Sequence, residues 1–106
     1  MLKLRQQAIE EKDLAAYKSL FLPDYADAGV SLDDLVTDME SMLSRYEHIE
    51  FHYKKTRPSI KMNSSRIVHW IQYQTKNKNK KIQEILLLRR VEGHWLISGG
   101  VRLSIL

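Results

Sequence analysis

Residues 81–98 read KIQEILLLRRVEGHWLIS, two apolar runs separated by a short polar turn. The first run contains Ile, Leu and Val, and the second, residues 94–98, contains Trp95 and Ile97. β-branched and aromatic side chains are typical of β-strands, and Glu92 with Gly93 supplies the chemistry of a tight turn. The stretch therefore predicts a β-hairpin, with strands over residues 81–91 and 94–98.

Two more strands are predicted upstream of this hairpin. Residues 66–75 are rich in Ile, Val, Trp and Tyr, and residues 48–53 alternate polar and apolar side chains, as a half-buried strand does. The polar residues 76–80 form the predicted tip between the second and third strands. Pro58 has no backbone N–H, so we expect it on an edge strand or at a bulge. Together these segments predict a meandering antiparallel sheet of about four strands.

The chain before Tyr46 has helical periodicity instead. Apolar side chains recur on one face over residues 2–22, where Asp13 marks a bend or break and Pro23 marks the end. Ser31 is the predicted N-cap of a second helix of about fourteen residues. Helices followed by a meandering sheet predict the α+β class, with the N-terminal helices packed on one face of the sheet.

The composition is that of an ordinary globular protein, and residues 1–106 are predicted to form one domain. The chain contains no cysteine, which excludes disulfides and thiolate metal sites. The net charge of +4 is mild, and no apolar run resembles a membrane span or a secretory signal. We therefore expect a cytoplasmic domain with no cofactor, no nucleic-acid partner and no membrane partner.

The order of the elements and three short motifs resemble the nuclear transport factor 2-like superfamily, which includes ketosteroid isomerase-like and polyketide-cyclase-like proteins. The motifs are Ala8 through Asp13 to Tyr17, LPDY at residues 22–25, and GHWLI at residues 93–97, which matches a Gly-x-Trp-x-Ile closing hairpin. The resemblance implies a cystatin-like cone, in which a strongly curved sheet wraps a long helix and leaves a pocket at its open end. Members include isomerases, dehydratases, epoxide hydrolases, transport adaptors and domains without chemistry, so no single activity is implied.

The second predicted strand carries the candidate site. Ile67, His69, Ile71 and Tyr73 share one face of it, and the family pattern implies that this face points into the cone. The side chains expected to line a ligand pocket there are Tyr17, Tyr53, His69, Tyr73 and Trp95, with Arg90 as a further concave-face candidate.

His69 is the candidate catalytic residue, because an imidazole titrates near neutral pH and can act as a general acid or base. The favoured alternative is a core histidine that bonds to a helix residue such as Tyr17. The family's enzymes work with a carboxylate and a tyrosine or histidine, and no aspartate or glutamate is predicted on an inward strand position. Proton transfer would then have a base and no partner, so the sequence favours a non-catalytic domain.

No metal site is predicted. His48 and His52 lie four residues apart on a predicted strand, roughly 13 Å from one another and too far to share an ion. Basic side chains also gather at one end of a hairpin, but without interleaved exposed aromatics they indicate a solvated turn rather than a nucleic-acid site. These residues are Lys76, Lys78, Lys80, Lys81, Arg89 and Arg90.

The opposite sheet face predicts a homodimer. Residues 85–88 are apolar on both faces of their strand, which indicates that both faces are covered. The competing cover is the tail, in which Val101, Leu103 and Ile105 resume a strand-like alternation. The expected dimer-interface residues are Val68, Trp70, Ile85, Leu87 and Leu96.

The leading hypothesis is a non-catalytic small-molecule-binding or association domain, with a small apolar ligand between helices and sheet. One alternative is a small cofactor-independent isomerase or dehydratase, with His69 as acid–base and Tyr17 or Tyr73 orienting the substrate. The other alternative is a protein-interaction module that acts through the outer face of the sheet.

Overall fold

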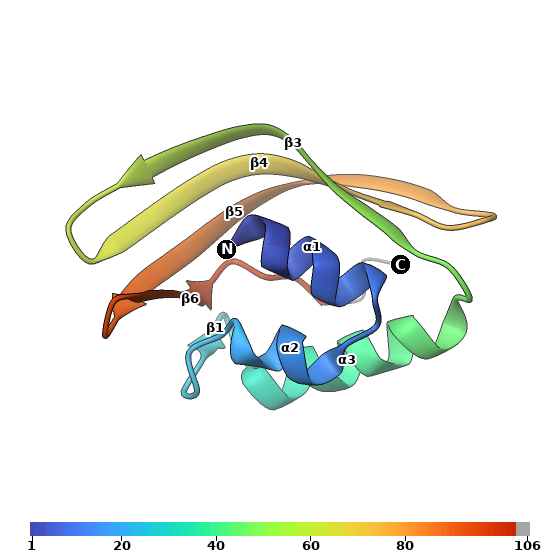
Figure 1. Cartoon of the computed structure of the whole chain (residues 1–106), viewed down its shortest axis with the longest axis horizontal. Helices are drawn as coiled ribbons and strands as arrows, with labels where there is room; N and C mark the ends of the chain where they lie inside the picture. Colours follow the sequence, from blue (N-terminus) through green and yellow to red (C-terminus); the bar gives the residue numbers. More distant parts are fainter. Residues whose placement is uncertain (104–106) are drawn as a thin grey trace.

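The computed structural model describes residues 1–103. Within them, three α-helices precede one antiparallel sheet of order β3-β4-β5-β6, and a small separate hairpin, β1-β2, lies between the second and third helices. Figure 1 shows the sheet arching over the helices, which confirms the predicted α+β class with the helices on one face. The elements are α1 (Leu2–Glu10), α2 (Leu14–Ser19), β1 (Ala26–Asp27), β2 (Val30–Ser31), α3 (Leu32–Arg45), β3 (Glu50–Ile60), β4 (Ser64–Gln74), β5 (Asn79–Val91) and β6 (His94–Gly99).

The predicted first helix is broken into α1 and α2 at Asp13. Lys12 takes a positive φ of 57°, which ends α1. Asp13 then caps α2, since its Oδ1 accepts the Ala16 N–H at 3.0 Å. The Asp13 side chain thus accepts a backbone hydrogen bond in place of a helical carbonyl, and it separates the two helices.

Helix α2 ends earlier than predicted, before Leu20 rather than at Pro23. The reason is a tertiary contact with β6. The Ile97 N–H donates to the Leu20 carbonyl at 2.7 Å, and the Leu22 N–H donates to the Ile97 carbonyl at 3.0 Å. The chain after α2 therefore lies along β6 in an extended conformation.

The segment between α2 and α3 contains a hairpin that the sequence analysis missed. Ala28 and Gly29 both have positive φ, as a two-residue hairpin loop requires. The N-cap of α3 is as predicted: Ser31 Oγ accepts the Asp34 N–H at 3.2 Å, and Asp34 Oδ2 accepts the Ser31 N–H at 2.9 Å.

Strand β3 begins at Glu50, two residues later than predicted, and it continues through Pro58. It forms an edge of the sheet, and its register shifts between Lys54 and Arg57. Pro58 thus lies on an edge strand beside an irregularity, where its missing N–H is tolerated.

Burial alternates along the strands and divides the sheet into two faces. The buried positions of β4 and β5 face the helices, and we call this the inner face: Ser65, Ile67, His69, Ile71, Tyr73, Glu84, Leu86 and Leu88. The intervening residues form the outer face. The inner face shares one hydrophobic core with the helices, and Phe51 of β3 and Ile97 of β6 are fully buried in it.

Gly100 follows β6 and crosses close to strand β5. Its φ is +92°, and a Cβ added there would lie 1.9 Å from the Ile85 carbonyl oxygen. Only glycine allows the chain to pass β5 at this distance.

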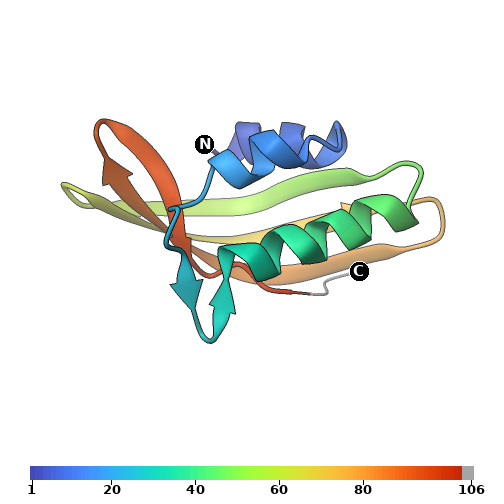
Figure 2. The same cartoon turned by 90° about the horizontal axis from the view of Figure 1, so that it is seen from below.

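The start of the tail runs into the core and not across the outer face. Val101 is buried, and its N–H donates to the Tyr25 hydroxyl at 3.3 Å. The predicted strand-like alternation does not form through Leu103, and Ile105 lies outside the described residues. Figure 2 shows this segment alongside β5 and α3.

Candidate functional site

The side chains predicted to line a pocket lie in the interior. Tyr17, His69 and Tyr73 are each 1% exposed, while Tyr53 and Trp95 are partly buried against the core. None of these five residues lines the two cavities described below, but Tyr53 lines another, of about 680 Å³, between β3 and β4. Arg90 is exposed at the end of β5. Their role in binding a ligand stays a prediction.

His69 belongs to a buried polar network that joins α1 to the sheet. Arg5 of α1 donates from Nη1 and Nη2 to the two carboxylate oxygens of Glu84, at 2.7 and 2.8 Å. His69 Nε2 lies 2.7 Å from Glu84 Oε1. Each of the three residues is 1% exposed. The glutamate therefore bonds to a helix residue and a neighbouring strand at once, where Tyr17 had been the expected partner of His69.

The network keeps Glu84 ionised. Burial alone would raise the pKa of Glu84, but the Arg5 guanidinium, with hydrogen bonds from Arg5 and His69, outweighs it and lowers that pKa to about 2. Burial would likewise lower the pKa of Arg5, and the Glu84 carboxylate raises it above its ordinary value instead. Because an ionised carboxylate only accepts hydrogen bonds, His69 donates from Nε2.

Three buried polar atoms near this network have no hydrogen-bond partner: Arg5 Nε, Tyr53 Oη and His69 Nδ1. The Tyr53 and His69 rings lie 4.9 Å apart, and the Arg5 guanidinium lies 5.4 Å from the centre of the Phe51 ring. Burial raises the pKa of Tyr53 to about 12, so its hydroxyl stays protonated. The aromatic rings thus enclose the cation and supply no base.

The network has the parts of a proton-transfer pair but not the access. A histidine bonded to a carboxylate can act in acid–base chemistry, and the expectation that no acid faces inward is wrong, because Glu84 does. However, Arg5 binds both carboxylate oxygens, and all three side chains are sealed from solvent. The Arg5 guanidinium balances the charge of the Glu84 carboxylate, so the ion pair has a structural explanation without any catalytic role.

Sequence reasoning missed two members of the network, although a signal existed for each. Glu84 lies two residues before Leu86, so it shares the inner face of β5. Arg5 lies three and four residues before Ala8 and Ile9, on the apolar face of α1. Neither residue was predicted to be buried, because charged side chains are usually exposed to solvent.

An apolar cavity of about 730 Å³ lies between α2, the start of α3 and β6. Phe21, Tyr25 and Leu32 contribute buried side chains to it, and Leu96 borders it from β6. It therefore lies between helices and sheet, as the predicted pocket did, but on different residues. The remaining lining residues are Ala15, Lys18, Ser19, Pro23, Asp24, Ser31 and Asp33.

Four of the five predicted interface residues lie side by side on the outer face. Val68 of β4 pairs directly with Ile85 of β5, while Trp70, opposite Gln83, and Leu87, opposite Arg66, flank that pair in opposite directions along the strands. Ile85 is 42% exposed and Leu87 is 38% exposed. We call these four residues the apolar patch. Leu96 lies further along, opposite Arg89, and lines the cavity beside α2.

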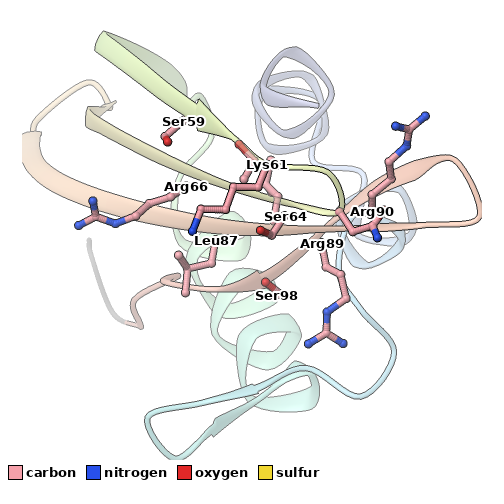
Figure 3. Close-up of a pocket in the computed structure, with 11 residues that line it drawn as sticks. Ser59, Lys61, Ser64, Arg66, Leu87, Arg89, Arg90 and Ser98 are labelled. Carbon is pink, nitrogen blue, oxygen red and sulfur yellow. The ribbon is translucent and has the colours of Figure 1, made fainter.

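A second cavity, of about 920 Å³, opens at one end of the outer face, and we call it the basic groove. In Figure 3, Arg66 and Arg89 extend to opposite sides, with Lys61 and Leu87 between them. Serine hydroxyls come from three strands, at Ser59, Ser64 and Ser98. The other lining residues are Asn63, Ser65, Leu88 and Arg90.

Residues 1–103 contain no group of three or more histidines, cysteines, aspartates or glutamates placed to hold a metal ion. In the same part of the chain, no helix has the length and the apolar character needed to cross a membrane.

No protein-family model matches the sequence, and no curated protein is similar to it. Solved structures do match in shape. A protein from Streptomyces avermitilis, described as a putative dehydratase of the NTF2-like family, has a TM-score of 0.75 at 11% identity, covering 93% of this chain and 88% of that one. The chain has the nuclear transport factor 2-like fold. Likeness at this identity establishes the fold alone.

Two further solved structures are similar in shape to this chain. A Nostoc punctiforme protein of unknown function with a cystatin-like fold has a TM-score of 0.75 at 10% identity, covering 92% of this chain and 80% of that one. Bd1075 of Bdellovibrio bacteriovorus has a TM-score of 0.84 at 13% identity. The match covers 97% of this chain but only 38% of Bd1075.

Proposed function

We propose that this chain is a non-catalytic association domain that pairs with a second copy through the apolar patch. The observation that carries the proposal is the partial exposure of four large apolar side chains on two adjacent strands. Val68 and Ile85 are directly paired, with Cβ atoms about 5 Å apart, and Trp70 and Leu87 are their diagonal neighbours on either side. Soluble monomers seldom leave such a patch open to water.

The described part of the tail leaves this patch uncovered. Val101 is buried in the core and bonds to Tyr25, so the chain leaves β6 toward the helices. The tail therefore gives no cover to Val68 or Ile85 as far as residue 103. A second copy can supply that cover, and two-fold pairing is the commonest arrangement of soluble oligomers.

The enzyme alternative has weaker support. It needs His69 to meet a substrate, and both His69 and Glu84 are 1% exposed with the carboxylate bound by Arg5. One structural neighbour is described as a putative dehydratase, but it shares 11% identity with this chain. Fold likeness alone does not transfer an activity.

Sedimentation velocity tests the association directly. We expect the wild-type chain to sediment as a dimer at tens of micromolar and Ile85→Lys to sediment as a monomer, because a lysine ammonium cannot be buried unpaired in the interface. The matched control is Leu4→Lys, at a side chain of α1 that is 56% exposed and far from the outer face in sequence and fold. A wild-type monomer, or equal effects of the two variants, would contradict the proposal.

A second candidate function is the binding of a small apolar molecule in the cavity between α2, α3 and β6. The cavity volume of about 730 Å³ suits a drug-sized ligand. The fluorescent probe anilinonaphthalene sulfonate tests it: Ala15→Trp, which narrows the cavity, should abolish probe binding. Ala26→Trp, at an exposed residue of β1 outside the cavity, should not. Unchanged probe fluorescence in both variants would exclude this site.

A further inference from the structure

Charge is strongly segregated along the chain. Residues 19–44 contain six acids and no lysine or arginine: Asp24, Asp27, Asp33, Asp34, Asp38 and Glu40. Residues 51–83 contain nine bases and no acid: Lys54, Lys55, Arg57, Lys61, Arg66, Lys76, Lys78, Lys80 and Lys81. The acidic segment forms the β1-β2 hairpin and α3, and the basic segment forms β3, β4 and the start of β5. The sheet side of the molecule is therefore positive although the net charge is only +4.

The basic groove concentrates part of this charge on a rigid scaffold. Arg66 pairs across the strands with Leu87, and Arg89 is the next outer residue of β5, opposite Ser64. The two arginines thus occupy diagonal positions, about 7–8 Å apart at their backbones. Lys61 lies between them at the end of β3, as Figure 3 shows.

The cations of the groove have no internal counter-charge. The ion pairs within residues 1–103 join Arg5 and His69 to Glu84, on the other face of the sheet. Lys61, Arg66 and Arg89 are all exposed and form no ion pair with a described residue. Positive charge held in a concave surface attracts anionic ligands and raises their association rate.

We propose that the basic groove binds an extended acidic segment of a partner protein. In an extended peptide, alternate side chains lie on one face, so carboxylates along one strand can meet Arg66 and Arg89, whose side chains extend to opposite sides of the groove (Figure 3). Each guanidinium can receive one carboxylate in a two-pronged hydrogen bond. The serine hydroxyls supply further hydrogen bonds, and Leu87 contacts the aliphatic part of the acidic side chains.

A polypeptide suits the groove better than a nucleic acid. Single-stranded nucleic acids bind by stacking bases on aromatic rings beside a basic track, and no aromatic residue lines this groove. Trp70 lies outside it, and Lys81 covers its ring at 5.7 Å. A second copy paired through the apolar patch would bring its own Arg66 and Arg89 near this surface, so it would supply no counter-charge to the groove.

Fluorescence anisotropy with a labelled peptide carrying glutamates at alternate positions tests the proposal. The double variant Arg66→Glu/Arg89→Glu should weaken binding at least about tenfold. Lys76→Glu/Lys80→Glu makes the same change of net charge at the hairpin tip and should weaken it at most about twofold. The neutral variant Arg66→Gln/Arg89→Gln is the folding control. It should also bind the peptide more weakly, and its circular dichroism spectrum should match that of the wild type.

Three outcomes would overturn the proposal. Equal losses in the groove and tip variants would show attraction to net charge alone. Equal affinity for a peptide with glutamines in place of glutamates would exclude charge recognition, and tighter binding of labelled oligouridine would assign the groove to RNA. Leu87 belongs to both the groove and the apolar patch, so the dimer is tested separately at Ile85, which lies outside the groove.

Discussion

Glu84 and Ile85 are neighbours on strand β5, yet the glutamate is 1% exposed and the isoleucine is 42% exposed. The inner face of the sheet buries an arginine, a glutamate and a histidine, and pairs them with one another. The outer face leaves four apolar side chains partly exposed, and its groove cations Lys61, Arg66 and Arg89 form no ion pair with a described residue. The usual distribution of polar and apolar residues is thus reversed at these two positions.

The difference between the two faces teaches where to look for function. A paired charge sealed in the core is explained by the fold, because it joins α1 to the sheet and leaves no net charge inside. A partly exposed apolar patch beside unpaired cations has no such internal explanation. The outer face is therefore the more informative surface, although the inner face carries the residues that resemble a catalytic pair.

The largest effect should come from unpairing the inner network. Arg5→Met leaves the Glu84 carboxylate buried without its counter-charge, which should cost about 3–5 kcal/mol of the free energy of unfolding. The double variant Arg5→Met/Glu84→Gln should recover part of that loss, since it removes the stranded charge. Urea denaturation followed by circular dichroism measures both.

Arg66→Met is the matched control on the outer face, where the guanidinium is exposed and forms no described ion pair. It should change the free energy of unfolding by no more than about 0.5 kcal/mol. Similar losses from Arg5→Met and Arg66→Met would mean that the two faces do not differ as described.

Lowering the pH should reduce the free energy of unfolding through Glu84 of the inner face. The folded pKa of Glu84 is about 2, below its ordinary value of 4.5, so the ionised carboxylate stabilises the fold. That contribution is fully present above about pH 4.5 and is lost as the pH falls toward 2. Chemical denaturation across this window should show a steeper loss of stability in the wild type than in Glu84→Gln. Parallel pH profiles would contradict this assignment.

A smaller effect is expected where the chain passes β5. Gly100→Ala puts a Cβ 1.9 Å from the Ile85 carbonyl oxygen and also strains a positive φ. Gly93→Ala strains a φ of +81° with no atom within 4 Å, so it isolates the backbone cost of roughly 1 kcal/mol. The difference between their thermal midpoints measures the close approach to β5. Equal midpoints would place the tail away from this edge.

Much of the fold could be predicted because it rests on local signals. The periodicity change near Tyr46, the cap at Ser31 and the turn at Gly93 each specify a boundary that the structure confirms within about two residues. The early end of α2 could not be predicted this way. It depends on the hydrogen bonds that Leu20 and Leu22 make with Ile97, which lies far away in the sequence.

The candidate site could be predicted only in part, because its residues also meet through contacts between distant parts of the chain. Strand alternation grouped His69 with Ile67 and Ile71, and the resemblance implied that this face points inward, where His69 is buried. The sequence could not show that Arg5 and Glu84, seventy-nine residues apart, form one ion pair. Alternation placed Leu96 on the outer face, and it does pair with the outer residue Arg89, but the sequence could not show that it also borders the cavity beside α2. Both the Arg5–Glu84 ion pair and the position of Leu96 beside the cavity depend on contacts between residues far apart in the sequence.

Methyl NMR across a dilution series tests the central claim, that the outer face associates while the inner face stays sealed. Lowering the protein concentration should shift the methyl signals of Val68, Ile85 and Leu87. The signals of the inner-face residues Ile71 and Leu86, both 0% exposed, should remain constant. Shifts confined to the inner face, or no concentration dependence at any methyl group, would contradict the account.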